Sequence, residues 1–180
     1  MERSGVINIY KEAGYTSHDV VAKLRGILKQ KKIGHTGTLD PQAQGVLPVC
    51  LGKGTKLCDL LADHDKEYEA VLRLGITTDT QDMEGNVLQE SSVQVSKEEV
   101  RTCILSFQGE QMQVPPMYSA LKVNGKKLYE LAREGKVVER KARPVTFHKI
   151  EVLWMELPKV KIRVQCSKGT YIRTLCNDIG

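Results

Sequence analysis

The chain has 180 residues and a net charge of +5 at pH 7, with 41% hydrophobic and 27% charged residues. This size suits one domain with a hydrophobic core, and the composition excludes collagen-like and low-complexity chains. No apolar run is long enough to span a membrane, and Val6 to Tyr10 is too short for the core of a signal peptide. We therefore expect a cytoplasmic protein that does not bind a membrane.

The first sixty residues predict a strand and two helices. Val6 to Tyr10 has the apolar character of a short strand. Thr16 or Ser17 is expected to cap a helix that ends at Gly34, and Thr55 to cap a short second helix. The apolar face of the first helix consists of Val20, Val21, Leu24, Ile27 and Leu28.

The middle of the chain predicts two strands and a helix. Tyr68 to Leu74 alternates in hydrophobicity, and a turn precedes a short strand near Val87. Ser96 and Glu99 form a capping box, which starts a helix. One side of that helix carries Val100, Ile104 and Phe107.

The last third predicts a hairpin, two helices and two strands. Asn124-Gly125 is typical of a hairpin turn, and Leu128 to Arg133 of a short helix. Strands are expected at Val145 to Trp154 and at Val160 to Cys166, followed by a helix that begins near Tyr171. Together these elements predict an α+β fold with a mixed, mainly antiparallel sheet flanked by helices and loops.

The loop Gly34 to Pro41 is the most informative segment of the chain. Its glycines allow the backbone to bend closely around another group, and Pro41 disfavours helical geometry at Asp40. A loop of this kind presents a carboxylate at a defined place. The simpler interpretation is a turn in which Asp40 only bonds local amides, and local chemistry alone slightly favours it.

Basic residues are concentrated in three blocks. Residues 20–36 carry five bases and no acid, residues 121–149 carry nine bases and three acids, and residues 159–173 carry five bases and no acid. Residues 59–99, by contrast, hold eleven acids. Because basic blocks that converge form a polyanion-binding face, nucleic acid is the favoured partner, although any single block would fit solvated surface.

Several site types do not fit the sequence. The five cysteines include no Cys-x-x-Cys pair, which argues against a disulfide framework or a zinc ribbon. The spacing of Cys50, Cys58 and His64 matches no zinc template, so we expect buried thiols and no metal. Gly52 to Lys56 lacks the upstream glycine of a phosphate-binding loop, and neither a nucleophile elbow nor His-Glu-x-x-His is present. A two-carboxylate glycosidase stays possible, but the other acids lie mostly in surface contexts.

One placed carboxylate, basic surface and aromatic residues on polar loops fit an enzyme that acts on a nucleobase. Such an enzyme extracts the base, stacks it on aromatic rings and binds the backbone with Lys and Arg. Arg173 is the obvious guanidinium partner for Asp40. For Tyr68 and Tyr171, core packing with the hydroxyl at the rim stays an alternative. The aromatic residues are Tyr15, Tyr68, Tyr118 and Tyr171.

These segments resemble the TruB family of RNA pseudouridine synthases. Two motifs carry the resemblance, Gly34 to Pro41 with Gly45 to Pro48 behind it, and Lys168 to Leu175. The match is ordered and runs along the whole chain. Supporting matches are Gly14 to Val21, Lys66 to Tyr68, Pro115 to Lys122 and Asn124 to Glu130.

The resemblance implies a fold, a reaction and a partner. It implies the pseudouridine synthase catalytic fold over residues 1–180, with an RNA-gripping insertion at about 113–143. The implied reaction converts a T-loop uridine of tRNA, uridine 55, to pseudouridine by base flipping. The reaction needs no cofactor. The expected partner is tRNA, with no obligatory protein partner, and we expect a monomer.

The resemblance also assigns roles to single residues. Asp40 corresponds to the catalytic aspartate, which either attacks the ribose C1′ as a nucleophile or removes the 2′ proton to give a glycal. Arg173 would pair with Asp40. Tyr68 would stack on the flipped base, with the late proton transfer as a second role open to it. Tyr171 would support the base pocket, and His35 would occupy or contact the space that the flipped nucleotide leaves. Weaker RNA contacts are expected from Lys11, Lys126, Lys127 and Lys168.

The chain departs from the family pattern in two places. Lys11-Glu12 stands where the family usually has Lys-Pro, a change we expect to be tolerated. The family continues with the rest of the catalytic domain and a small RNA-binding PUA domain, so we expect a truncated chain. Pairing with a guide-RNA complex is less expected, because the insertion is of the bacterial stand-alone type.

Two further functions stay open at this point. The three basic blocks would also suit a tRNA-binding folding helper without chemistry of its own. A uracil-releasing hydrolase would use the same base-flipping logic, but nothing further in the sequence favours it.

Overall fold

The structure, a computed structural model, describes residues 2–180. Its contacts divide the chain into two compact units, Met1–His64 and Asp65–Gly180. Among the described residues, no helix combines the length and the apolar character that crossing a membrane requires.

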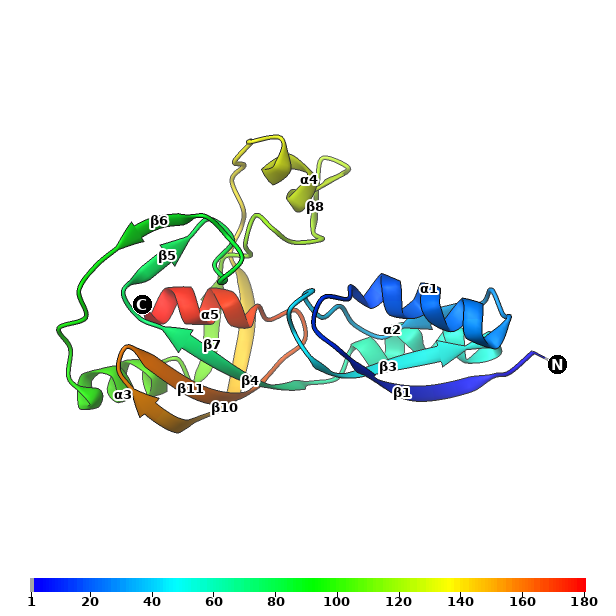
Figure 1. The fold of residues 1–180 in the computed structure, drawn as a ribbon, viewed down its shortest axis with the longest axis horizontal. Helices are drawn as coiled ribbons and strands as arrows, with labels where there is room; N and C mark the ends of the chain where they lie inside the picture. Colours follow the sequence, from blue (N-terminus) through cyan, green and yellow to red (C-terminus); the bar gives the residue numbers. More distant parts are fainter. Residues whose placement is uncertain (1) are drawn as a thin grey trace. The chain divides into compact units, whose positions relative to one another are not determined.

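The first unit is a three-stranded antiparallel sheet covered by a helix. Its strands are β1 (Gly5–Lys11), β3 (Gly45–Leu51) and β2 (Ile33–His35), in the order β1-β3-β2. The helix α1 (Ser17–Leu28) lies along this sheet (Figure 1) and shares a core with it. The prediction of strand β1 and of this helix is confirmed, whereas β2 and β3 were not predicted. The shared core consists of Val20, Val21, Ile33, Leu47, Val49 and Leu51.

The start of α1 agrees with the sequence-based prediction, and its end does not. Thr16 is the N-cap and forms a reciprocal capping box with Asp19. Of the two predicted caps, Thr16 and Ser17, the first is therefore confirmed. The prediction that Gly34 ends the helix is wrong. The helix ends at Lys29, which adopts the left-handed conformation with φ of 51°, and Gly34 lies within β2. A Cβ on Gly34 would lie 3.2 Å from Cys58 Sγ, so close packing explains this glycine.

Thr55 does not cap a helix, contrary to the prediction. It lies inside the 3-10 helix η1 (Gly52–Leu57), where its hydroxyl donates to Gly52 O at 2.9 Å. The short helix α2 (Cys58–Ala62) follows directly, and its first turn has no side-chain cap. Continuation from η1 therefore replaces the predicted cap.

The second unit is built on a four-stranded antiparallel sheet. The order is β4 (Lys66–Arg73), β11 (Lys159–Cys166), β10 (Arg143–Glu156) and β7 (Gly109–Gln113). Every pairing in it is antiparallel, which confirms the predicted α+β class. The alternation predicted for β11 is also confirmed. Its core-facing residues, all 0% exposed, are Val160, Ile162, Val164 and Cys166.

Two helices cover the apolar face of this sheet. These are α3 (Lys97–Ser106) and α5 (Ile172–Ile179), both drawn against the sheet in Figure 1. The predicted capping box at Ser96 starts α3, with Glu99 as its partner. The core that the helices share with the sheet includes Val100, Ile104, Phe147, Ile150, Leu175 and Ile179.

Smaller elements complete the second unit. The strands β5 (Ile76–Thr78) and β6 (Val87–Glu90) form a hairpin, of which only β6 was predicted. The strand β7 was not predicted either.

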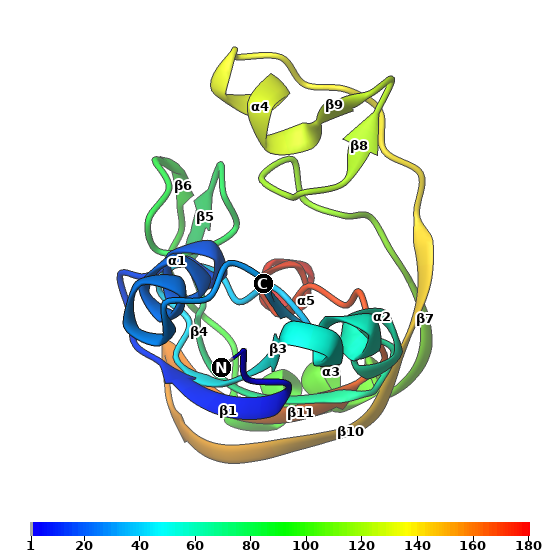
Figure 2. The same ribbon diagram turned by 90° about the vertical axis from the view of Figure 1, so that its right-hand side faces the viewer.

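Residues 114–142 form an excursion between two neighbouring strands. Gln113 at the end of β7 pairs with Arg143 at the start of β10, so the chain leaves the sheet and returns at one place. The excursion holds β8 (Lys122–Val123), β9 (Lys126–Lys127) and α4 (Leu128–Arg133), and it projects from the ends of β7 and β10 (Figure 2). The predicted Asn124-Gly125 hairpin turn and the helix after it are confirmed, with both turn residues at positive φ.

Candidate active site

The loop that carries Asp40 is fixed by hydrogen bonds on both sides of this residue. Leu39 N–H donates to Ser17 Oγ at 3.0 Å, and Ser17 is 2% exposed. Asp40 O accepts from Ala43 N–H at 3.0 Å, which closes a turn with Pro41 at its second position. Asp40 itself is exposed. The loop therefore presents the residue at the surface of the first unit from a restrained backbone.

A buried lysine, Lys11, also binds the backbone of the Asp40 loop. Lys11 is 0% exposed, and its ammonium donates to Glu12 O at 3.0 Å, to Tyr15 O at 2.6 Å and to Pro41 O at 3.0 Å. Burial lowers the pKa of Lys11, and the Asp40 charge opposes this shift. Its three protons face backbone carbonyls, and the RNA contact expected of Lys11 stays a prediction. The residue ties β1 to the Asp40 loop.

His35 lies at the start of this loop as a half-buried ring. Its centroid is 5.6 Å from that of His18, at an interplanar angle of 75°. Burial lowers the pKa of His35, the charge of His18 lowers it further, and a hydrogen bond with the Gly37 backbone opposes both. The imidazole is therefore mainly neutral at pH 7.

In the second unit, Arg173 is held by three neighbours. Its side chain is 12% exposed, and Nη2 donates to Tyr118 O at 2.7 Å. Nη1 lies 3.4 Å from Asp82 Oδ2, and the guanidinium lies 5.8 Å from the centroid of the Tyr171 ring. The guanidinium therefore has a fixed place beside one predicted base-pocket residue.

Asp82 is the site residue that the sequence analysis missed. It lies in the turn expected before the strand near Val87, and its partner Arg173 is 91 positions away in the chain. The preceding residue, Gln81, adopts a left-handed φ of 62°, and its side chain accepts a hydrogen bond from Thr174 at 2.7 Å. The only local signal was an acid within a polar turn.

Tyr68 and Tyr171 both lie next to α5. Tyr68 is half-buried on the core face of β4, where its neighbour on β11 is Val164. Tyr171 is the N-cap residue of α5 and is half-buried. Their predicted roles at a flipped base stay predictions, and core packing accounts for part of the surface of Tyr68.

The remaining predicted RNA contacts lie at the surface of the second unit. Lys126 has a side chain 60% exposed and lies 3.7 Å from Glu134, and Lys168 is exposed. Lys127 is half-buried and donates to the Tyr129 hydroxyl at 3.2 Å. Lys126 and Lys168 are thus exposed residues, whereas Lys127 is partly covered. The predicted pairing of Asp40 with Arg173, which belong to different units, stays a prediction.

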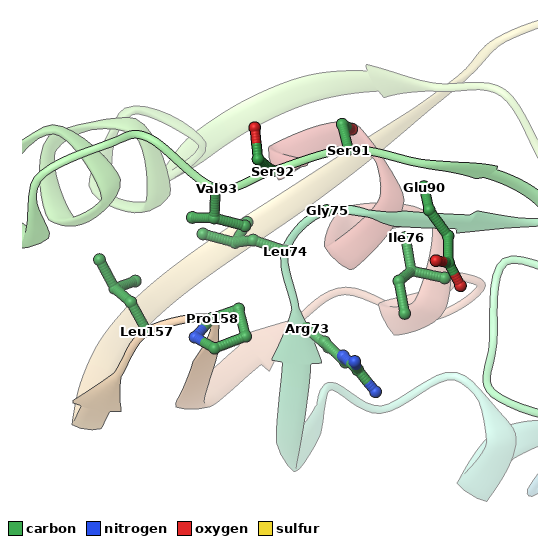
Figure 3. A pocket seen from close by; sticks show the side chains of 10 residues that line it. All are labelled: Arg73, Leu74, Gly75, Ile76, Glu90, Ser91, Ser92, Val93, Leu157 and Pro158. Carbon is green, nitrogen blue, oxygen red and sulfur yellow. The ribbon is translucent and has the colours of Figure 1, made fainter.

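Other features of the described residues contribute no further candidate catalytic group. An open pocket of about 580 Å³ lies beside the end of β4 and the turn between β10 and β11 (Figure 3). Of the described residues that line it, none is a predicted site residue. Within residues 2–180, no three His, Cys, Asp or Glu side chains are grouped to hold a metal ion. Burial raises the pKa of the Cys50 and Cys166 thiols to about 11, so both are protonated at neutral pH.

Comparison with known proteins identifies close sequence relatives. Residues 25–172 match the family model described as TruB family pseudouridylate synthase (N terminal domain). The chain is 60% identical over 177 residues to tRNA pseudouridine synthase B of Clostridium novyi, covering 98% of this chain and 61% of that protein. It is 63% identical over 185 residues to the protein of the same name from Lachnoclostridium phytofermentans, covering 98% and 60%. The chain thus spans about three fifths of the length of these relatives.

The chain is also similar to solved structures in sequence and fold. A chain in the crystal structure of a Cbf5-Nop10-Gar1 complex matches with a TM-score of 0.75 and 36% identity, covering 98% of this chain and 43% of that one. A chain in the structure of an H/ACA RNP bound to a substrate RNA containing 2′-deoxyuridine matches with a TM-score of 0.70 and 33% identity. That match covers 98% of this chain and 42% of the other.

Proposed function

Because the chain belongs to the TruB family of pseudouridylate synthases, we propose that it isomerises uridine 55 in the T-loop of tRNA to pseudouridine. The names of the relatives support tRNA as the substrate. The observation that carries the proposal is the restrained, surface-exposed Asp40 on the loop that the family signature covers.

The reaction breaks the bond between uracil N1 and the ribose C1′, turns the base and joins C5 to C1′. The proton leaves C5 and one is gained at N1, so no oxidant or cofactor is required. Asp40 begins the reaction either by attacking C1′ or by removing the 2′ proton to give a glycal. Both routes need a carboxylate in a fixed position, because misplacement by about 1 Å costs on the order of 100-fold in rate. The hydrogen bonds on both sides of Asp40 supply that restraint.

Four further residues are proposed to act on the flipped nucleotide or on Asp40. Tyr68 stacks on the flipped uracil, Tyr171 supports the pocket, and Arg173 pairs with Asp40 during the reaction. His35 enters the space that the flipped nucleotide leaves. Its lowered pKa suits this role, because a neutral ring replaces a stacked base without burying a charge.

Binding of the tRNA backbone is assigned to the basic surface of the second unit. The excursion 114–142 carries several exposed lysines and the exposed Arg133. Phosphate contacts from such side chains supply affinity without reading sequence. We propose a monomer that acts on tRNA in the cytoplasm without an obligatory protein partner.

The proposal is tested by measuring pseudouridine in a tRNA transcript. The assay uses the 180-residue chain and, in parallel, a hybrid in which this chain replaces the matched region of the Clostridium novyi relative. We expect the hybrid to form one pseudouridine per tRNA at position 55. We expect Asp40→Asn to lower the rate at least about 1,000-fold while the Kd for tRNA changes less than about threefold. Unchanged activity of Asp40→Asn would refute the assigned role, and free uracil as the product would indicate a hydrolase.

A tRNA-folding helper is the second candidate function, favoured by the exposed basic excursion. In that case Asp40→Asn would keep full rescue of a misfolded tRNA, and charge reversal at Lys126 would abolish it. Because both activities can coexist in one protein, folding and pseudouridine formation are measured separately.

A further inference from the structure

The first turn of α5 is held by a side chain from another strand. Tyr171, its N-cap residue, makes no side-chain capping bond of its own. Instead the amide of Gln113 donates to Tyr171 O at 3.1 Å and accepts from Tyr171 N–H at 2.9 Å. Gln113 lies at the end of β7, 58 positions earlier in the chain, and is 5% exposed.

These two hydrogen bonds hold both backbone polar groups of Tyr171. A single planar amide binds both the N–H and the C=O of Tyr171, as a neighbouring strand would. It therefore restrains both dihedral angles where the chain enters α5. Two predicted site side chains project from this point, the ring of Tyr171 and, two residues later, the guanidinium of Arg173.

We propose that Gln113 is a positioning residue for the reaction, acting through the backbone of Tyr171 on the Tyr171 ring and the Arg173 guanidinium. This inference rests on the proposed function, because it assumes that both groups meet the flipped uridine. Both hydrogen bonds of Gln113 described above go to the Tyr171 backbone, so its effect on the ring and the guanidinium is indirect. Its loss removes this partner from two partly buried backbone groups. Tyr171 O keeps the N–H of Leu175 as a donor at 3.1 Å, so the main loss falls on Tyr171 N–H and loosens the start of α5.

The same strand offers a matched control. Gln111 lies two residues earlier, on the same face of β7, and its amide donates to Phe107 O at 3.2 Å and to Ser106 O at 3.5 Å. Those carbonyls belong to the end of α3. Gln111→Leu therefore removes a half-buried amide of the same kind without touching α5.

The experiment compares Gln113→Leu and Gln111→Leu in the hybrid protein described above. We expect the single-turnover rate of pseudouridine formation to fall about 10- to 100-fold in Gln113→Leu, as for a misplaced reacting group. The Kd for tRNA should change less than about twofold, and Gln111→Leu should lose less than about threefold in rate. Equal losses in the two variants, or a loss that follows the fraction of folded protein, would overturn the inference.

A third variant tests rescue. Gln113→Glu keeps the acceptor for Tyr171 N–H, and only its protonated carboxyl can also donate to Tyr171 O. Its rate relative to the unsubstituted protein should therefore rise as the pH falls from 8 to 6. A pH-independent ratio would contradict the role assigned to the donated bond.

Amide hydrogen exchange at Tyr171 separates this inference from the proposed function. In Gln113→Leu the exchange of Tyr171 N–H should accelerate at least about tenfold, while in Gln111→Leu it should stay unchanged. If the unsubstituted hybrid forms no pseudouridine, the proposed function fails, and the exchange rates still decide whether Gln113 orders the start of α5. Unchanged exchange in Gln113→Leu would overturn the positioning role whatever the activity.

Discussion

Replacement of Lys11 by methionine tests what restrains the Asp40 loop. Methionine fills nearly the same space, so the change removes the ammonium and its three hydrogen bonds without a large cavity. All three bonds go to backbone carbonyls of the first unit, and one of them, Pro41 O, directly follows Asp40. The ammonium is thus the link between β1 and the loop.

The expected loss of stability follows from the fate of the three carbonyls. Pro41 O keeps a second donor, since Gly14 N–H also binds it at 3.0 Å. Glu12 O and Tyr15 O each lose a charged donor, at about 1 to 3 kcal/mol for a carbonyl left without its bond. Part of this is regained, because burial of the Lys11 ammonium is itself unfavourable, as its lowered pKa indicates. We therefore expect Lys11→Met to lower the free energy of unfolding of the first unit by about 2 kcal/mol.

The measurement combines urea unfolding with hydrogen exchange of peptides from the first unit. The control is Lys53→Met, at an exposed lysine of the same unit, which should change stability by less than about 0.5 kcal/mol. Exchange should accelerate most in residues 36–43, and pseudouridine formation should fall with unchanged affinity for tRNA. A loss of stability no larger than that of Lys53→Met would show that the ammonium does not restrain the loop.

Two further predictions concern charge. The NMR titration of His35 should have its midpoint below pH 6.5, because burial lowers its pKa. His18→Ala should raise that midpoint, because the charge of His18 also lowers the pKa of His35. An unchanged midpoint in His18→Ala would contradict the electrostatic coupling of the two rings. Since the folded-state pKa is below the unfolded value, His35 lowers stability progressively as the pH falls below 6.5. The double change Lys126→Glu and Lys127→Glu should weaken tRNA binding and reduce the slope of log Kd against log salt concentration by about 2, one per lost phosphate contact. An unchanged slope would show that Lys126 and Lys127 do not contact the phosphates of the tRNA.

Elements with a strong local signal were predictable from the sequence. Ser96 and Glu99 form the predicted capping box, and Asn124-Gly125 forms the predicted hairpin turn at positive φ. In both cases the residues that determine the conformation lie within four positions of one another. The alternation in β11 was equally readable, because one face of the strand is fully buried.

Predictions failed where packing across the unit overrides local preference. Gly34 was read as a helix end, but it is a strand residue that gives room to Cys58 Sγ, 24 positions later in the chain. The burial of Lys11 was not predicted either, because lysine side chains are usually exposed. Lys11 is buried because three backbone carbonyls surround its ammonium. Two of these carbonyls belong to the loop that directly follows Lys11 in the chain.

The start of α5 shows why the rest of the site could not be read from sequence. The motif Lys168 to Leu175 is local, yet its side chains are placed by partners from three other segments. Arg173 binds Asp82 and Tyr118 O, Thr174 binds Gln81, and the Tyr171 backbone binds Gln113, across 55 to 93 positions of chain. Because these contacts restrain three residues within one turn of chain, Tyr171, Arg173 and Thr174, they act on one rigid body. Substitutions in the 81–82 turn and at Gln113 should therefore be non-additive, since the first to release the helix start removes what the second would have disturbed.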